Sequence, residues 1–284
     1  MELVRALATL VEPPSADRRA LEHALGLAAP PSAEEHTDLF VLQLPPYASI
    51  YLGEEGMIGG DARDRVAGFW RALRLLPPAE PDHLTALLGL YATVGELAET
   101  ETEPARRVLA ERAGAALFWE HLASWLPVYL LRVGELGAGP HRRWAALLGA
   151  VLAADAERWG PPDSIPAHLR ESTALVDEDL DRERIVRAVL SPVRSGLVLT
   201  RADLGRAARD LGLGLRLGER AFVVRTLIDQ DARSVVRWLA GEARRQAGGH
   251  RGLAAPLQPL VRLWRERAES SACRLLRLVG DRTA

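Results

Sequence analysis

Hydrophobic residues recur at helical spacing along almost the whole chain. The clearest run starts at Leu84, where apolar side chains follow every three or four residues as far as Leu97, the period of one face of an α-helix. The alternation typical of a half-buried strand is confined to the short stretch 195–200. The pattern predicts an all-α fold, with helices over residues 1–11, 16–25, 32–44, 47–51, 61–76, 84–97, 101–136, 140–159, 185–190, 202–211, 220–228, 232–246 and 257–278.

Residues that favour helix ends divide these segments. Ser32 and Asp61 precede helical runs, and their side chains can accept hydrogen bonds from the first free N–H groups of a helix. The strongest break is Gly160-Pro161-Pro162, because proline cannot continue a helix and glycine favours turns. We therefore predict a helical domain over residues 1–162 and a helical C-terminal extension over residues 163–284 that packs on it.

Charge is distributed unevenly between these two parts. Residues 1–162 contain 14 arginines and 22 acidic residues, a net charge of −8, whereas residues 163–284 contain 22 arginines and 16 acidic residues, a net charge of +6. An acidic part suits a basic ligand, although solvation and pairing within the chain explain the same distribution. The acidic run 176–181 is expected to be exposed.

Length, cysteine content and hydropathy restrict the class of protein. The 284 residues, of which 48% are hydrophobic, suffice for a sizeable core. The single cysteine, Cys273, excludes an internal disulfide and a multi-cysteine metal site within one chain. A signal peptide would show a basic start followed by an apolar stretch, and this pattern is not found. No apolar run approaches the ~20 residues of a membrane span. We expect a cytoplasmic protein without stable membrane insertion.

The stretch from 79 to 84, called the hinge segment below, concentrates polar chemistry directly before the clearest helix. It contains Glu80, Pro81, Asp82 and His83, followed by Leu84. Pro81 suits a first helical turn, and Asp82 is expected to cap the helix that follows. Glu80, Asp82 and His83 are also compatible with acid–base catalysis, but the chain offers no nucleophile in a recognisable motif. We favour a hinge that lines a peptide groove over a catalytic site.

Two further motifs flank the hinge segment. Tyr47, Ile50 and Tyr51 lie upstream of it, and His121 and Trp125 lie downstream. This order resembles the TorD/DmsD/NarJ family of redox-enzyme maturation chaperones, in which an aromatic motif precedes an E-P-D-H hinge and an H-x-x-x-W pattern follows. The resemblance extends from about residue 33 to residue 159, and the C-terminal portion, which contains the stretch 191–196, resembles the extension of the longer family members.

The resemblance implies a multi-helix TorD-like chaperone fold and a function without catalysis. The implied function is to bind the twin-arginine leader, or another segment, of an apo-molybdoenzyme of the dimethyl-sulfoxide-reductase type and to assist cofactor insertion before export. The implied partner is the catalytic subunit of that enzyme or its leader, bound by a monomer or a homodimer, with no nucleic acid. Contact with GTP or the molybdenum cofactor is implied by the resemblance only, and no cofactor is expected otherwise.

Ten residues are expected to form the peptide-binding site. The two carboxylates would pair with arginine, and the aromatic and aliphatic residues would contact the apolar part of the leader. We expect Tyr47, Tyr51 and Trp125 to be half-exposed, because amphipathic aromatic side chains suit recognition sites. Phe69 and Trp119 are assigned to the core. The ten residues are Tyr47, Ile50, Tyr51, Glu80, Pro81, Asp82, His83, Leu84, His121 and Trp125.

Two other classes of function stay open from the sequence. The arginine-rich stretch 200–228 has features of a helix-turn-helix DNA-binding regulator, although its glycine-rich part, 212–218, is too long for the usual turn. We interpret Arg206, Arg209, Arg216 and Arg220 in this stretch as a solvated face. The second class is an all-α enzyme that uses His83 and a carboxylate. No spacing of ligands supports a metal site at His83 and His121.

Overall fold

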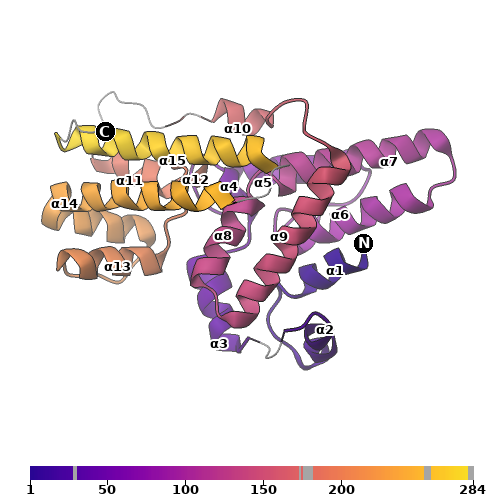
Figure 1. The fold of residues 1–284 in the computed structure, drawn as a ribbon, viewed down its shortest axis with the longest axis horizontal. Helices are drawn as coiled ribbons and strands as arrows, with labels where there is room; N and C mark the ends of the chain where they lie inside the picture. Colours follow the sequence, from indigo (N-terminus) through magenta and orange to yellow (C-terminus); the bar gives the residue numbers. More distant parts are fainter. Residues whose placement is uncertain (28–30, 173, 175–181, 253–256, 281–284) are drawn as a thin grey trace. The chain divides into compact units, whose positions relative to one another are not determined.

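Helices form almost all of the regular structure in residues 1–27, 31–172, 174, 182–252 and 257–280, which the computed structural model describes (Figure 1). No strand occurs in these ranges, and their extended pairing is an isolated antiparallel bridge between Tyr47 and His83. The predicted all-α fold is confirmed. The acidic run predicted to be exposed, 176–181, lies outside the described residues.

The stretch 195–200, which was the candidate for a strand, does not form one. Ser195 ends the short helix α12, Pro192–Ser195, and the residues after Gly196 are extended without a partner strand. The side chain of Gln246 makes the hydrogen bonds that a partner strand would make. Its Oε1 accepts from the N–H of Val198 at 2.9 Å, and its Nε2 donates to the carbonyl of Val198 at 3.3 Å. The buried backbone is thereby satisfied by a helix side chain.

The chain forms two compact units. Of the described residues, 1–49, 58–166 and 257 belong to the first unit, and 50–57, 167–172, 174, 182–252 and 258–280 belong to the second unit. The division therefore falls between Pro166 and Ala167, close to the predicted boundary after residue 162. One difference from the predicted domains is the segment 50–57, which belongs to the second unit although it lies early in the sequence. The packing of the extension on the first domain stays a prediction.

The first unit is built around α6, whose apolar face is deeply buried. Leu84, Leu87, Leu88 and Tyr91 are each at most 2% exposed, and α6 packs against α1 and α7, while α8 packs against α9. Burial of this apolar surface is the main stabilising contribution to the unit. Its helices are α1 Glu2–Thr9, η1 Ala16–Arg18, α2 Arg19–Ala24, α3 Ala33–His36, η2 Thr37–Gln43, α5 Gly60–Ala72, α6 Leu84–Thr100, α7 Pro104–Ala116, η3 Leu117–Leu122, α8 Leu126–Leu136 and α9 Gly139–Trp159.

Three predicted helix boundaries in the first unit can be compared with the structure. Ser32 caps α3 as predicted, since its hydroxyl accepts from the N–H of Glu35 and the Glu35 carboxylate accepts from the N–H of Ser32. The prediction that Asp61 caps α5 is wrong. The N-cap residue of α5 is Gly59, which has a φ of 100° and makes no side-chain hydrogen bond to the helix. The stretch 101–136, predicted to be helical and continuous or nearly so, is helical over most of its length but is not one α-helix. It divides into α7, the wider π-helical turn η3 and α8, which restarts with Pro127 in its first turn.

The second unit has its own apolar core, in which α14 and α15 run side by side (Figure 1). The two helices predicted over 220–228 and 232–246 are confirmed as the halves of α14, which is kinked at Asp231 (φ −154°, ψ 87°). The Asp231 carboxylate accepts from the N–H of Ser234 and so caps the second half. Its helices are α10 Ala167–Glu171, α11 Arg182–Leu190, α12 Pro192–Ser195, α13 Arg201–Leu211, α14 Arg220–Gly249, η4 His250–Gly252 and α15 Gln258–Leu278.

One short helix belongs to both units. The helix α4, Ala48–Leu52, begins in the first unit and ends in the second, because the division of the chain falls between Ser49 and Ile50. Among the helices in the described ranges, none is both long enough and apolar enough to cross a bilayer.

Candidate functional site

The ten predicted site residues differ widely in exposure. Glu80 is exposed, and Tyr47 and His83 are half-buried. The other members are buried: Ile50, Tyr51, Pro81, Asp82, Leu84, His121 and Trp125. The surface that a ligand can reach is therefore smaller than the motifs indicate, and it is centred on Tyr47, Glu80 and His83.

A backbone bridge holds these three side chains together. The N–H of Ala48 donates to the carbonyl of Asp82 at 3.0 Å, and the N–H of Leu84 donates to the carbonyl of Pro46 at 2.8 Å. Tyr47 and His83 lie opposite each other in this bridge, with their rings edge to face and their centroids 4.8 Å apart. Tyr47, the first residue of the upstream aromatic motif, therefore meets the hinge segment in space.

Asp82 does not cap the helix that follows it. Its carboxylate accepts from the N–H of Ser49 at 3.1 Å, in the first turn of α4, and its side chain is 1% exposed. Asp82 thus accepts a hydrogen bond from a helix N-terminus, as expected, but the helix is α4 and not the α6 that follows it in the sequence. A carboxylate in this position holds the bridge in place and does not face a ligand.

His83 caps α6 in place of Asp82. Its Nδ1 accepts from the N–H of Thr85 at 3.3 Å, which requires this nitrogen to be unprotonated. Burial lowers the pKa of His83, and the nearby carboxylates of Glu12, Glu80 and Asp82 oppose that shift. The cap and the low pKa both favour the neutral imidazole, so His83 presents an aromatic ring and not a charge at neutral pH.

The exposed edge of the site carries two carboxylates. Burial, and after it the interaction of the Tyr47 hydroxyl with the carboxylate of Glu80, raise the pKa of Tyr47 to about 12. The second carboxylate is that of Glu12, whose Oε1 lies 4.0 Å from Nδ1 of His83 and whose side chain is 50% exposed. We call Tyr47, Glu80, His83 and Glu12 the acidic–aromatic site.

Sequence reasoning missed Glu12. It lies between the first two helices of the chain, in a stretch without a motif, and only the fold brings it beside His83. The sole signal in the sequence is the excess of acidic residues in the first part of the chain.

The remaining residues of the aromatic motif lie elsewhere. Ile50 and Tyr51 belong to the second unit, at 4% and 1% exposure. The half-exposed position expected for Tyr51 is therefore wrong. The segment that carries them is tied into the second unit, because the hydroxyl of Ser191 donates to the carbonyl of Gly53 at 3.4 Å. The buried environment explains these apolar residues without a ligand.

The downstream motif has a local structural explanation. Trp125 Nε1 donates to the carbonyl of His121 at 2.9 Å. The spacing of four residues therefore corresponds to one turn that begins in η3 and ends after it. Trp125 is fully buried, and its expected half-exposure is wrong. His121 packs edge to face against Phe69, with a centroid distance of 5.1 Å, and burial lowers the pKa of His121 to about 4. Both residues are part of the core of the first unit.

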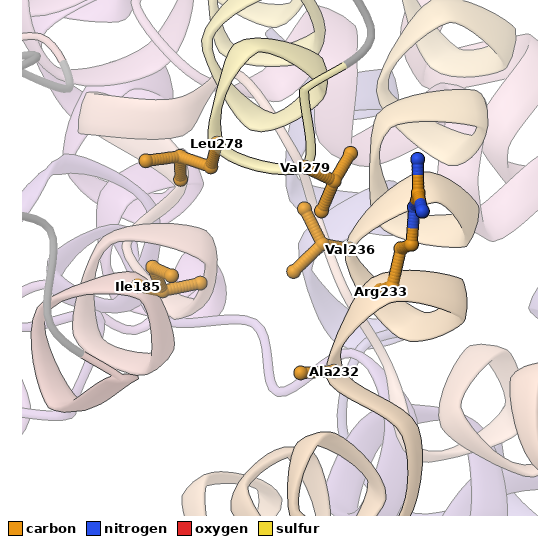
Figure 2. Close-up of a pocket in the computed structure, with 6 residues that line it drawn as sticks. All are labelled: Ile185, Ala232, Arg233, Val236, Leu278 and Val279. Carbon is orange, nitrogen blue, oxygen red and sulfur yellow. The ribbon is translucent and has the colours of Figure 1, made fainter.

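The second unit contains a cavity of about 440 Å³ at the ends of α11 and α15 and the kink of α14. Figure 2 shows aliphatic side chains around the opening, with Arg233 at one side beyond Val236. No carboxylate lines it, so it does not suit a basic peptide. Its lining residues are Ile185, Ala232, Arg233, Val236, Leu278 and Val279.

The arginine-rich stretch of the second unit is not a continuous solvated face, and this part of the prediction is wrong. Arg206 donates to the carboxylates of Asp203 and Glu242, at 3.0 and 2.8 Å. Arg220 donates to the carbonyl oxygens of Leu199 and Gly56, at 2.9 and 3.3 Å. Two of the four arginines are thus occupied within the fold, which weakens the case for a DNA-binding surface.

The parts of the chain that the structure describes contain no group of three histidine, cysteine or acidic residues placed to hold a metal ion. A comparison with protein-family models matches residues 13–130 to the family described as nitrate reductase delta subunit. The matched stretch contains the hinge segment, both flanking motifs and nearly all of the acidic–aromatic site. Searches of the curated proteins and of the solved structures find no match.

Proposed function

We propose that this protein binds an arginine-containing segment of an apo-molybdoenzyme at the acidic–aromatic site. The proposal is supported by the match of residues 13–130 to the nitrate reductase delta subunit family, which comprises maturation chaperones of molybdoenzymes. This match confirms the resemblance to the TorD/DmsD/NarJ family. The segment that we favour is the twin-arginine leader of a catalytic subunit, held until the cofactor has been inserted. The protein acts without catalysis and in the cytoplasm.

The observation that carries this proposal is the pair of exposed carboxylates beside two rings that pack edge to face. Glu80 interacts with the hydroxyl of Tyr47, and Oε1 of Glu12 lies 4.0 Å from Nδ1 of His83, so each carboxylate is associated with one ring of the pair. A guanidinium group forms strong, often bidentate hydrogen bonds with a carboxylate and also stacks on aromatic faces. Two such carboxylates suit a ligand with two neighbouring arginines.

Asp82 has a different role in this proposal from the one expected from the sequence. Since its carboxylate is buried and bound to the N–H of Ser49, it positions the bridge that carries Tyr47. Glu12 takes its place as the second carboxylate for the ligand. His121 and Trp125 support the core of the first unit and act on the site only through packing.

The apolar part of a leader needs an apolar contact near these carboxylates. Leu84 is fully buried, but Leu76 is 91% exposed and lies four residues before Glu80 in the connection between α5 and α6. Leu75, its neighbour, is 39% exposed. We assign the apolar part of the ligand to these two leucines, because exposed leucines next to a polar site are typical of recognition surfaces.

Titration of a fluorescently labelled twin-arginine leader peptide against the full chain tests the proposal. We expect Glu80→Gln and Glu12→Gln each to weaken binding about tenfold, because each removes one charge-assisted contact. The double variant should weaken binding further, and salt should reduce the affinity of the wild type more than that of the variants.

The matched control is Glu111→Gln, which removes an exposed carboxylate from α7, away from the acidic–aromatic site. Leu76→Ser should weaken binding with little effect on its salt dependence. Thermal melts of every variant show whether the fold is retained. Equal affinities for the wild type and the Glu12→Gln, Glu80→Gln double variant would exclude this site.

A further inference from the structure

The loop between α13 and α14 exposes an apolar surface that the proposed function does not use. Leu217 is 92% exposed, Leu215 is 48% exposed and Phe222, in the first turn of α14, is 38% exposed. The ring of Phe222 lies against the backbone of Gly218, since its Cδ1 is 2.6 Å from the position that a Cβ of Gly218 would occupy. The three apolar side chains therefore belong to one continuous segment, formed by the loop and the first turn of α14.

Hydrogen bonds fix this loop to the helices on both sides. Gly212 ends α13 with a left-handed φ of 66°, and the N–H of Leu213 returns to the carbonyl of Ala208 at 2.8 Å. The side-chain amide of Gln230, on α14, accepts from the N–H of Gly214 at 2.8 Å and donates to its carbonyl at 2.9 Å. The exposure of the leucines is thus a defined feature of the fold.

Arginine side chains accompany the apolar ones. Arg216 stands between Leu215 and Leu217 and is exposed. The side chains of Arg209 and Leu215 are neighbours over Gly205 of α13. A Cβ added to Gly205 would lie 3.5 Å from Arg209 Nη1 and 3.9 Å from Leu215 Cδ2. Arg209 is also exposed.

Two carboxylates lie in the same region and reduce its local charge. Asp210 accepts from Trp238 Nε1 at 2.9 Å, and Glu219 is exposed at the N-cap of α14. The sequence of the second unit as a whole contains 22 arginines and 17 acidic residues, a net charge of +5. The unit is therefore attracted to an anionic surface even though the loop alone is nearly balanced.

We propose that residues 212–218 and Phe222 dock the protein on the surface of an anionic lipid bilayer. The three apolar side chains would enter the boundary between headgroups and acyl chains, while Arg209 and Arg216 keep their guanidinium groups among the phosphates. Exposed single side chains on a loop suit a fluid interface, because lipids adapt to them without a matching pocket. Net positive charge favours anionic headgroups over neutral ones.

Sedimentation with lipid vesicles tests this inference on the full chain. We expect the protein to bind vesicles of phosphatidylcholine with about 30% phosphatidylglycerol at least tenfold more tightly than vesicles of phosphatidylcholine alone. Leu215→Ser combined with Leu217→Ser should reduce binding to the anionic vesicles about tenfold, since both apolar contacts are lost. Arg216→Gln should reduce it about fivefold, and added salt should weaken the binding of the wild type more than that of this variant.

The matched control is Leu76→Ser, because Leu76, at 91% exposure in the first unit, is as accessible as Leu217. It should leave vesicle binding within about twofold of the wild type. Conversely, Leu217→Ser should not change binding of the leader peptide, so the two proposals fail separately. Absence of binding to anionic vesicles would overturn the inference, as would equal losses for Leu76→Ser and the loop variants. Binding of duplex DNA that is lost in the same loop variants would assign the loop to nucleic acid instead.

Discussion

The carboxylate of Asp82 accepts a hydrogen bond from the backbone N–H of Ser49, 33 residues earlier in the chain, at a distance of 3.1 Å. The backbone of Asp82 adds a second bond, in which the N–H of Ala48 donates to its carbonyl at 3.0 Å. Together they attach the start of α4 to the hinge segment and place Tyr47 beside His83. The acidic–aromatic site therefore depends on a residue that contributes to it from within the core.

Replacement of Asp82 is predicted to reduce stability more than it reduces intrinsic affinity for the ligand. Asp82→Ala leaves a buried N–H without a partner and should lower the free energy of unfolding by about 1–3 kcal/mol. Asp82→Asn keeps a carbonyl acceptor and should cost less. Urea unfolding followed by circular dichroism measures both changes. An Asp82→Ala protein with the stability of the wild type and no peptide binding would instead make Asp82 a direct ligand contact.

The first unit is predicted to lose stability as the pH falls below the ordinary pKa of histidine. Burial lowers the pKa of His121 to about 4 in the folded protein, whereas the unfolded chain titrates near ~6.5. The unfolded state therefore binds more protons below pH ~6.5, so the stability present above that pH is lost as the pH falls toward 4. For His121 alone the loss between about pH 7.5 and about pH 5 is ~2 kcal/mol.

Urea unfolding at several pH values measures this loss. His121→Gln should flatten the dependence of stability on pH, and the remaining dependence should come from groups such as His141, whose pKa is also lowered to about 4 by burial. His23→Gln provides the control, because His23 is exposed. If His121→Gln follows the same pH curve as the wild type, protonation of His121 does not limit stability.

Two glycines in the second unit provide a matched test of helix packing. Gly196 and Gly212 both end helices with a left-handed φ, of 73° and 66°. A Cβ on Gly196 would lie 2.4 Å from the backbone N of Ala268, on α15, whereas nothing lies within 4 Å of one on Gly212. Gly212→Ala should cost about 1–2 kcal/mol from backbone strain alone, and Gly196→Ala should cost at least about 3 kcal/mol because a backbone contact must also separate. Comparable melting temperatures for the two variants would contradict the close approach of α12 to α15.

Several features of this protein followed from the sequence because they depend on neighbours in the chain. The helix predicted over 140–159 corresponds to α9, Gly139–Trp159, and the helix predicted over 202–211 corresponds to α13, Arg201–Leu211. Helical periodicity and residues that stop helices act within a few positions of one another, so a single sequence contains that information. The order of the three motifs also indicated the resemblance to this family, which the match of its model to residues 13–130 confirms.

Other features depended on contacts between distant parts of the chain, and only the tertiary structure decided them. Asp82 has the chemistry of a helix cap, but which helix it caps is set by the approach of α4 to the hinge segment. Trp125 and Tyr51 are suited equally to a core and to a half-exposed site, and packing placed both in the core. Glu12 became part of the site because the fold brings it to His83. Exposure and long-range pairing are properties of the packed chain, so local patterns identify the residues able to act while packing determines which of them face solvent.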